Sequence, residues 1–315
     1  MPLNALVTGG AGFIGSHVTE ALLAEGWSVT VLDNLSSGKR GQVPAAAHFV
    51  EADIRSPEAA ALIRDGGFDL VCHLAAQIDV RKSVADPRFD VDVNIGGTLN
   101  LVEAVRASGR RTRFLFASTG GAVYGDLVTP PNVETFAKNP ESPYGIAKYS
   151  VELYLAYYAR VHGLDYVALR FANVYGPRQD PHGEAGVVAI FCQRILAGTP
   201  LTVFGDGAQT RDYVYVGDIA RAHVRAAALP TIPAGAVDDR AFNLGTAVDT
   251  SVTALAHGLL AVSGRTVPMQ HAPARPGEQQ RSVVSIDKAR TGLGWAPAVS
   301  LADGLRLTFD WFASR

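Results

Sequence analysis

A tyrosine and a lysine stand four residues apart in a segment with helical character. Tyr144 and Lys148 therefore lie on one face of the predicted helix, where their side chains are neighbours. A lysine charge beside a phenol favours the phenolate, and the first turn of a helix also favours negative charge. The spacing predicts a tyrosine base whose pKa lies below its ordinary value of about 10. An exposed surface pair that arose by chance is the alternative interpretation.

Two hydroxyl groups favour the catalytic interpretation. Ser118 and Thr119 directly follow the apolar run 113–117, which reads as a buried strand. Ligands of open α/β sheets bind beyond the carboxyl ends of the strands. The hydroxyl groups are therefore expected at the edge of the sheet where Tyr144 would act.

A glycine-rich loop lies between the first predicted strand and the first predicted helix. Gly9, Gly12 and Gly15 allow a tight turn and the close approach of a pyrophosphate to the helix N-terminus. Asp33 ends the next strand, where a carboxylate can accept ribose hydroxyl groups and repels a 2′-phosphate. This arrangement favours an NAD site over a structural turn, and NAD over NADP. Asp53, after the third strand, either caps a helix or touches adenine.

Strands alternate with helices through the first half of the chain. Such alternation predicts an α/β fold, with a Rossmann-type, doubly wound parallel sheet and helices on both faces. The expected strands are 3–8, 28–32, 48–50, 70–74, 113–117 and 166–170, and the expected helices are 16–25, 94–107 and 143–162.

The pattern changes after Asn173 to loops rich in proline and glycine, with helices at 187–197 and 216–228. We therefore expect residues 1–173 to form a Rossmann domain that binds NAD, with parts of 214–247 packed back on it. Residues 174–315 are expected to form a smaller α/β region that binds the substrate.

Composition excludes several classes of function. The 315 residues carry a net charge of −2, which would attract neither nucleic acid nor an anionic membrane. No apolar stretch reaches the ~18 residues of a membrane span, and the N-terminus lacks the features of a secretory signal. Two distant cysteines favour a cytoplasmic location, and the eight histidines show no metal-ligand spacing. The basic run Arg110-Arg111-Arg113 reads as a solvated loop.

In combination these motifs resemble the extended short-chain dehydrogenase/reductase family, and in particular its nucleotide-sugar branch of UDP-glucose 4-epimerases. The resemblance runs in order over most of the chain. It is carried by residues 8–15, Asp33, residues 74–76, Asn94, Ser118-Thr119, Tyr144 with Lys148, residues 169–178, Gly205-Asp206-Gly207, Arg211-Asp212-Tyr213 and Arg275-Pro276-Gly277-Glu278.

The resemblance implies a role for each catalytic residue. Tyr144 would take a proton from a sugar hydroxyl, while Lys148 would hold the nicotinamide ribose and lower the tyrosine pKa. Thr119 would bind the same sugar oxygen, with Ser118 as the alternative because Gly120-Gly121 makes this segment one residue longer than usual.

The resemblance also assigns binding residues. The implied NAD contacts are Gly9, Gly12, Phe13, Ile14, Gly15, Asp33, Asn34, Asp53, Ile54, Leu74, Ala75, Ala76, Gln77, Asn94, Tyr144 and Lys148. The implied contacts to a UDP-sugar are Thr119, Tyr144, Asn173, Val187, Thr202, Phe204, Arg211, Arg275, Glu278 and Ser282. Arginine suits a diphosphate because its planar fork matches phosphate oxygens.

The segment after Thr119 decides among the reactions of this group. Related 4,6-dehydratases carry Asp-Glu there and related decarboxylases usually carry Glu, whereas this chain has Gly120-Gly121-Ala122. Without a titratable group for a second reaction, the 4-keto sugar can only take its hydride back. We expect 4-epimerisation of UDP-glucose and UDP-galactose. A dehydratase or decarboxylase, and a non-catalytic NAD(H)-sensing protein of the same fold, are the alternatives.

Two expectations concern assembly and substrate size. Family members pair through helices that correspond to 93–107 and 143–162, and the apolar Leu153, Tyr154, Tyr157 and Tyr158 favour a homodimer. Epimerases restricted to plain UDP-hexoses tend to carry a bulky tyrosine seven residues after the arginine of the Arg-Pro-Gly-Glu-like motif. Ser282 stands there and would leave room for an N-acetyl group, unless the loop register differs and Ser282 begins a strand at 283–286.

Overall fold

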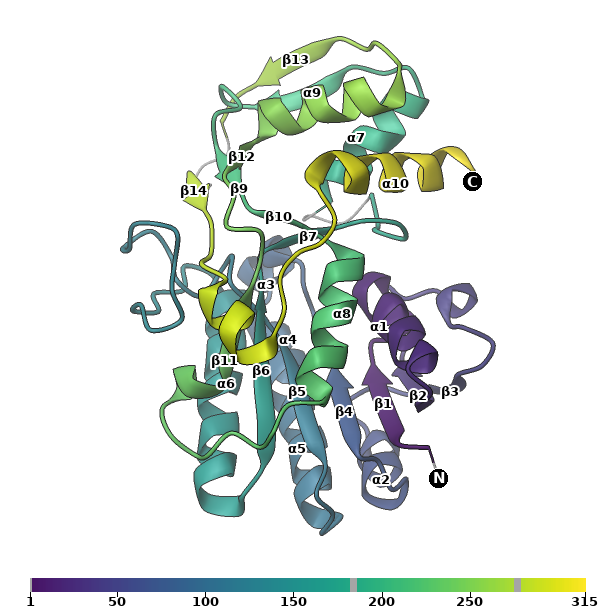
Figure 1. Ribbon diagram of the computed structural model, residues 1–315, viewed down its shortest axis with the longest axis vertical. Helices are drawn as coiled ribbons and strands as arrows, with labels where there is room; N and C mark the ends of the chain where they lie inside the picture. The colour runs from purple at the N-terminus through teal and green to yellow at the C-terminus, as the bar shows by residue number, and fades with distance from the viewer. Residues whose placement is uncertain (1, 182–185, 275–278) are drawn as a thin grey trace.

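The computed structural model describes residues 2–181, 186–274 and 279–315. A large sheet with helices on both faces occupies one end of the molecule, and a smaller lobe of helices and short strands occupies the other (Figure 1).

Seven parallel strands form the central sheet, in the order β3-β2-β1-β4-β5-β6-β11. The order reverses between β1 and β4, and open α/β sheets bind ligands at such a switch point. The predicted doubly wound α/β fold is thus confirmed. The strands are β1 (Asn4–Thr8), β2 (Ser28–Asp33), β3 (His48–Glu51), β4 (Leu70–His73), β5 (Arg113–Thr119), β6 (Asp165–Phe171) and β11 (Ala241–Leu244).

Helices cover both faces of this sheet. α1 and α8 pack on one face, and α2, α5 and α6 pack on the other, each layer with its own apolar core (Figure 1). The helices of this part are α1 (Phe13–Ala24), α2 (Pro57–Asp65), α3 (Val80–Ala85), α4 (Pro87–Val91), α5 (Thr98–Ala107), α6 (Pro143–His162) and α8 (Val216–Ala227), with the short turns η1 (Arg40–Gln42), η2 (Asp92–Gly97) and η3 (Val237–Arg240).

Helix α6 has the bounds that the sequence predicts. The Ser142 hydroxyl accepts a hydrogen bond from the Gly145 N–H at 3.1 Å, and Pro143 occupies the first helical position. Gly163 ends the helix with a φ of +70°, which glycine adopts without strain. These local signals fix where the helix begins, and they place Tyr144 in its first turn.

The smaller lobe has a third apolar core, built around Phe191, Leu201 and Leu255. Its sheets contain only two or three short strands each. Its elements are β7 (Asn173–Tyr175), α7 (Val187–Leu196), β8 (Leu201–Phe204), β9 (Thr210–Arg211), β10 (Tyr213–Tyr215), β12 (Thr250–Ser251), α9 (Val252–Ser263), β13 (Met269–Ala272), β14 (Arg281–Ser282) and α10 (Leu301–Ala313). The short helix η4 (Ala289–Leu293) packs instead against α8 and β11 at the central sheet.

Several predicted boundaries were wrong. α1 begins at Phe13 instead of Ser16, and the helix expected over 94–107 is a π-helical turn up to Gly97 followed by α5. Residues 283–286 are not a strand, because β14 ends at Ser282 and Val284 only bridges to Asn132.

The basic run is only partly a solvated loop. Arg113 begins β5, is 9% exposed and pairs with Asp165 at 2.8 Å. Burial of this arginine depends on a strand partner 52 residues away, which local charge patterning cannot reveal.

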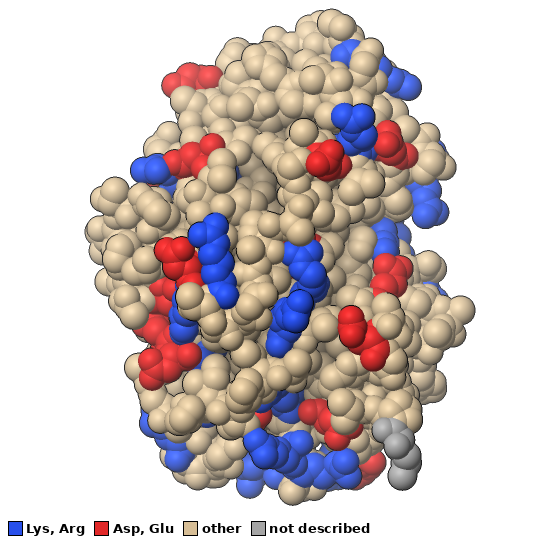
Figure 2. All heavy atoms as spheres, in the orientation of Figure 1, with Lys and Arg blue, Asp and Glu red and all other residues tan. Residues whose placement is uncertain are grey.

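The described surface agrees with the charge balance of the sequence. Lysine and arginine lie among aspartate and glutamate over the face drawn in Figure 2. Among the residues described, no helix combines the length and the apolar character that crossing a bilayer requires.

Candidate active site

A glycine cradle joins β1 to α1. A Cβ atom on Gly9, whose φ is +72°, would lie 2.6 Å from the Ala75 amide nitrogen, and one on Gly15 would lie 2.1 Å from the Gly9 carbonyl oxygen. Neither position can hold a side chain unless the backbone moves. The residue before the helix is Gly12, which has no side chain to cap it. The first N–H groups of α1 therefore remain available to a ligand. This cradle fits the pyrophosphate of a dinucleotide.

Asp33 lies at the end of β2 beside this cradle. Its carboxylate accepts hydrogen bonds from the backbone N–H groups of Ala11 at 3.0 Å and Leu35 at 2.8 Å. Burial raises the pKa of the Asp33 carboxyl, while the two backbone hydrogen bonds act in the opposite direction. Each carboxylate oxygen keeps a further lone pair, so the group can still accept ribose hydroxyls.

Asp53 and Asn34 support each other next to Asp33. The Asn34 amide donates to Asp53 at 2.9 Å, and Arg55 pairs with the same carboxylate at 2.8 Å. The Arg55 guanidinium holds the pKa of Asp53 well below its usual range. Helix α2 is capped by Ser56, so the helix-cap interpretation of Asp53 was wrong. The Ile54 side chain is buried in the core, which leaves its backbone as the part that could meet a cofactor.

The segment after β4 is tied to Asn94 on η2. The Gln77 N–H donates to the Asn94 side-chain oxygen at 2.9 Å, and the Asn94 amide donates back to the Gln77 carbonyl at 2.9 Å. Both side-chain amides also donate to one oxygen of Asp90. Leu74, Ala75 and Ala76 therefore lie in a segment that is fixed at both ends, beside Gly9.

Lys148 reaches from α6 to the strand that carries the hydroxyls. Its ammonium donates to the Ala117 carbonyl at 2.9 Å and lies 5.9 Å from the centre of the Tyr144 ring. Burial lowers the pKa of Lys148 to about 8. Burial also raises the pKa of the Tyr144 hydroxyl well above its ordinary value, and the Asp90 charge adds to this. The chain alone therefore does not produce the low tyrosine pKa that the sequence suggested, because burial and the Asp90 charge both disfavour the phenolate.

The structure separates the two candidate hydroxyls. Ser118 donates to the buried carboxylate of Glu152, which pairs with Arg170 at 2.6 Å. Thr119 is the partly exposed end of β5, and its hydroxyl has no hydrogen-bond partner in the described part of the chain. Ser118 is engaged in the core, and Thr119 faces outward from it.

Three predicted sugar-binding residues meet at one glycine. A Cβ atom on Gly121 would lie 3.8 Å from the Thr119 hydroxyl, 3.8 Å from the Ser282 hydroxyl and 3.9 Å from the Asn173 side-chain oxygen. These groups come from three different strands, β5, β14 and β7. Arg211 lies directly across from Ser282 in the pairing of β9 with β14.

The remaining substrate candidates are less closely gathered. Val187 begins α7 and packs partly against the core of the smaller lobe. Thr202 and Phe204 lie on β8, where the Thr202 hydroxyl accepts a hydrogen bond from Arg194 at 2.8 Å. Arg275 and Glu278 lie outside the described residues.

Sequence reasoning missed two buried carboxylates, Asp90 and Glu152, near Tyr144 and Lys148. Asp90 precedes Asn94 by four residues, and Glu152 follows Lys148 by four residues. Both are fully buried, with exposed fractions of 0%. The four-residue spacing from a predicted site residue was the available signal, because it places a side chain on the same helix face.

The chain belongs to the NAD dependent epimerase/dehydratase family, whose model matches residues 5–245. This confirms the resemblance to nucleotide-sugar epimerases of the extended short-chain dehydrogenase/reductase type, and it confirms NAD as the cofactor of the family.

Relatives within the family carry more specific names. UDP-glucose 4-epimerase of Mycolicibacterium smegmatis is 43% identical, and the match covers 99% of each chain. The crystal structure of UDP-glucose 4-epimerase from Thermotoga maritima with UDP-glucose is 46% identical, with a TM-score of 0.93 over 99% of each chain. The Thermus thermophilus UDP-glucose 4-epimerase complex with NAD is 44% identical, with a TM-score of 0.91 over 99% of each chain.

A structural neighbour with a different substrate has the same fold. UDP-N-acetylglucosamine 4-epimerase from Methanobrevibacter ruminantium, in complex with UDP-N-acetylmuramic acid, is 33% identical, with a TM-score of 0.92 and 99% of each chain covered. Overall similarity therefore does not decide whether an N-acetyl group is accepted.

Proposed function

We propose that this protein is an NAD-dependent 4-epimerase that interconverts UDP-glucose and UDP-galactose through a 4-keto sugar. One observation carries the proposal: Thr119 is followed by Gly120 and Gly121, and the side chains that the described residues bring to Gly121 are the hydroxyls of Thr119 and Ser282 and the amide of Asn173, with no carboxylate among them. Full-length similarity to UDP-glucose 4-epimerases supports it.

The two parts of the chain would divide the work. Residues 1–173, with the parts of 214–247 that contribute α8 and β11, would hold NAD, and residues 174–315 would mainly hold the nucleotide sugar. The predicted cofactor residues gather round the switch point of the central sheet, which supports this division. The UDP part would bind to Asn173, Val187, Thr202, Phe204, Arg211, Arg275 and Glu278.

The chain's own residues would move one proton and hold one oxygen. When bound, NAD supplies a reversible acceptor for the hydride at C4 of the sugar. Tyr144, as phenolate, would take the proton of the 4-hydroxyl group while Thr119 hydrogen-bonds the same oxygen. The Lys148 charge would favour the phenolate and hold the nicotinamide ribose.

The second half of the reaction needs the sugar to turn. Once C4 is a ketone, the ring would rotate and present its other face, while UDP stays bound to the smaller lobe. Tyr144 would return the proton to the oxygen as the hydride comes back. Because the hydride would then reach the opposite face of C4, the configuration at this carbon would be inverted.

Acceptance of N-acetylated UDP-hexosamines is a second candidate activity. The Ser282 hydroxyl lies close to the same glycine, Gly121, as the Thr119 hydroxyl, which supports a place for this small side chain beside the sugar. An aromatic side chain there would fill space that an N-acetyl group needs during rotation.

The experiment is product analysis. Purified enzyme with NAD is incubated separately with UDP-glucose, UDP-galactose and their N-acetylated forms, and the released sugars are identified. Interconversion at C4 is expected for the plain sugars, with N-acetylglucosamine turnover within about one order of magnitude. A 4-keto-6-deoxy or decarboxylated product would point to the other enzyme branches. NAD binding without turnover of any of these sugars would point to a sensor.

We further propose a homodimer that pairs through α6 and the helical stretch 93–107, with α4, which precedes that stretch, beside them. On α6, Leu153 is 46% exposed and both Tyr154 and Tyr157 are 44% exposed. Phe89 on α4 is 45% exposed. Tyr158, which the sequence placed on this surface, is buried and donates to Glu103. So much exposed apolar surface is unusual for a monomer.

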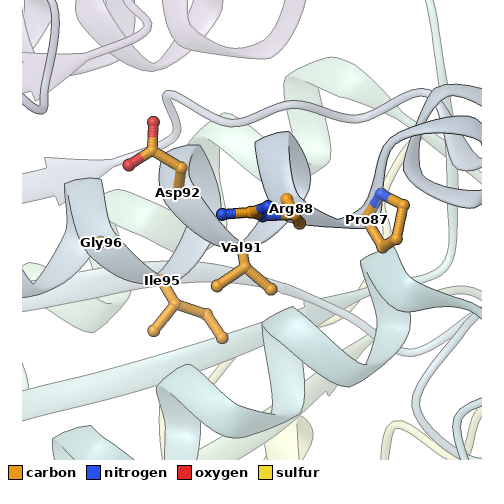
Figure 3. A pocket seen from close by; sticks show the side chains of 6 residues that line it. All are labelled: Pro87, Arg88, Val91, Asp92, Ile95 and Gly96. Atoms are coloured by element: carbon orange, nitrogen blue, oxygen red, sulfur yellow. The ribbon is translucent and has the colours of Figure 1, made fainter.

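A hollow of about 550 Å³ lies on the same side of the molecule. In the helical segment that lines this hollow, the side chains of Val91 and Ile95 point to one side and the side chain of Asp92 points to the other (Figure 3). Apolar side chains of a second copy would fit against Val91 and Ile95. Sedimentation at micromolar concentration should give a mass near twice 33.3 kDa, and a monomer would overturn the proposal.

We also propose a cytoplasmic location. Cys72 and Cys192 are buried free thiols, as is usual for proteins of a reducing compartment. Fractionation of cells that express the chain should recover it with cytoplasmic marker enzymes.

A further inference from the structure

A buried carboxylate lies beside the catalytic helix without a charged partner. Asp90 on α4 is 0% exposed, and one of its oxygens accepts hydrogen bonds from Gln77 at 2.9 Å and Asn94 at 3.0 Å. Its other oxygen is also buried and has no hydrogen-bond partner in the described parts of the chain. An unpaired buried carboxylate costs several kcal/mol, so its presence calls for an explanation.

The neighbouring carboxylate shows what is different about Asp90. Glu152 is equally buried, but Arg170 pairs with it at 2.6 Å and Ser118 donates to it. Within the described residues, Asp90 makes no ion pair with lysine or arginine. Its helix α4 packs against α6, which carries Lys148. Asp90 therefore lies at the contact between α4 and the helix of the catalytic pair, with no basic partner among the described residues.

We infer that Asp90, buried at the contact of α4 with α6, is a positioning residue that acts through Lys148. One oxygen of Asp90 also accepts hydrogen bonds from Gln77 and Asn94, and these bonds hold the segment beside the glycine cradle in place. The inference rests on the roles proposed for Tyr144 and Lys148.

The charges around Lys148 support this assignment. Burial lowers the pKa of Lys148 to about 8, while Asp90 and Glu152 act to raise it. Two further titratable neighbours are Tyr144, whose ring centre lies 5.9 Å from the ammonium and whose pKa is raised by burial and by Asp90, and His73, whose pKa burial lowers to about 3, so that it stays neutral. The removal of Asp90 would leave only Glu152, which is paired with Arg170, to oppose burial, and the pKa of Lys148 would fall further.

The test is the pH profile of Asp90→Asn, which keeps the shape and removes the charge. On the alkaline side of the profile, the kcat of this variant should fall at a pH about 1 unit lower than the kcat of the wild type. At pH 8 its kcat should therefore be roughly fivefold lower. At pH 6, where Lys148 is charged in both proteins, kcat should be at least that of the wild type. KM for UDP-glucose should stay unchanged. Asp310→Asn, on the exposed side of α10, is the matched control and should leave the profile unchanged.

Each result decides the matter. A folded Asp90→Asn enzyme with the wild-type profile, or with kcat lowered equally at every pH, overturns the inference. If Asp90→Asn does not fold, Asp90→Ser should show the same acid shift, and failure of both neutral variants to fold would assign Asp90 to stability alone. Tyr144→Phe is measured in parallel. If this variant is active, the roles proposed for Tyr144 and Lys148 are overturned as well. If it is inactive, a failed test concerns the role of Asp90 alone.

Discussion

The proposed cofactor side and the proposed sugar side of the site differ in how their polar groups are held. On the cofactor side, the side chains of Asp33, Asn94 and Lys148 all have hydrogen-bond partners within the chain, at 2.8–3.0 Å. On the sugar side, the polar ends of Thr119 and Ser282 make no hydrogen bond among the described residues. The first set is ordered before anything binds, and the second is left free.

This difference matches what the proposed reaction asks of each side. NAD is regenerated in every turnover, so a pre-organised cradle can keep it bound without ordering costs. The sugar has to present both faces to the same tyrosine, so strong contacts to its ring would slow the rotation. Its nucleotide, held on the smaller lobe, supplies the binding energy instead.

The largest effect is expected at Tyr144, which would act between the cofactor and the sugar. Tyr144→Phe should lower kcat by about 10²–10⁴, because a positioned acid–base group is lost. Binding of NAD and of UDP should change little. Steady-state kinetics and calorimetric titration with UDP measure both; a variant with a tenth of the wild-type rate would exclude Tyr144 as the base.

The next test fills space on the proposed sugar side of the site. Ser282→Tyr should lower kcat/KM for UDP-N-acetylglucosamine by about 100-fold while UDP-glucose turnover stays within a few-fold of the wild type, since only the larger sugar needs the space. Competition between the two substrates measures this ratio directly. Ser282→Ala, which keeps the space open, is the control and should retain both activities. If wild-type enzyme ignores the N-acetylated sugar, another side chain closes the pocket.

Loosening the ordered side should have a smaller effect. Asp33→Ala removes a carboxylate that can bind ribose hydroxyls and repel a 2′-phosphate, so NAD should bind about tenfold more weakly and NADP should begin to compete. Dissociation constants for both dinucleotides, measured by fluorescence, provide the test. An unchanged preference would place the ribose contact elsewhere.

The smallest effect concerns the helix that carries the tyrosine. Ser142→Ala removes the hydrogen bond to the Gly145 N–H and should lower the free energy of unfolding by about 1 kcal/mol. The tertiary contacts of α6 would still hold Tyr144, so kcat should change less than twofold, within about 0.4 kcal/mol. Denaturant unfolding and kinetics on the same sample separate the two quantities. A large loss of kcat would show that the cap itself orients the base.

Local signals predicted much of this arrangement. The spacing of glycines between a strand and a helix gave the cradle, and the cap residues gave the bounds of α6. Boundaries that depend on packing were predicted less well. The π-helical turn at residues 92–97 carries Asn94 and Gly97, where a Cβ atom would lie 2.6 Å from Ile54, so its shape depends on a neighbour distant in sequence.

By itself, the sequence determined which groups are available and in what order: the tyrosine and lysine on one helix face, the hydroxyls at a strand end, and glycines where acids would change the reaction. Only the tertiary structure decided which hydroxyl is free, since Ser118 on β5 donates to Glu152 on helix α6 and Thr119 does not. It also decided the electrostatics, because the pKa of a buried group depends on desolvation and on charges that arrive from other elements, such as Asp90 beside Lys148. Neither quantity is encoded in local spacing.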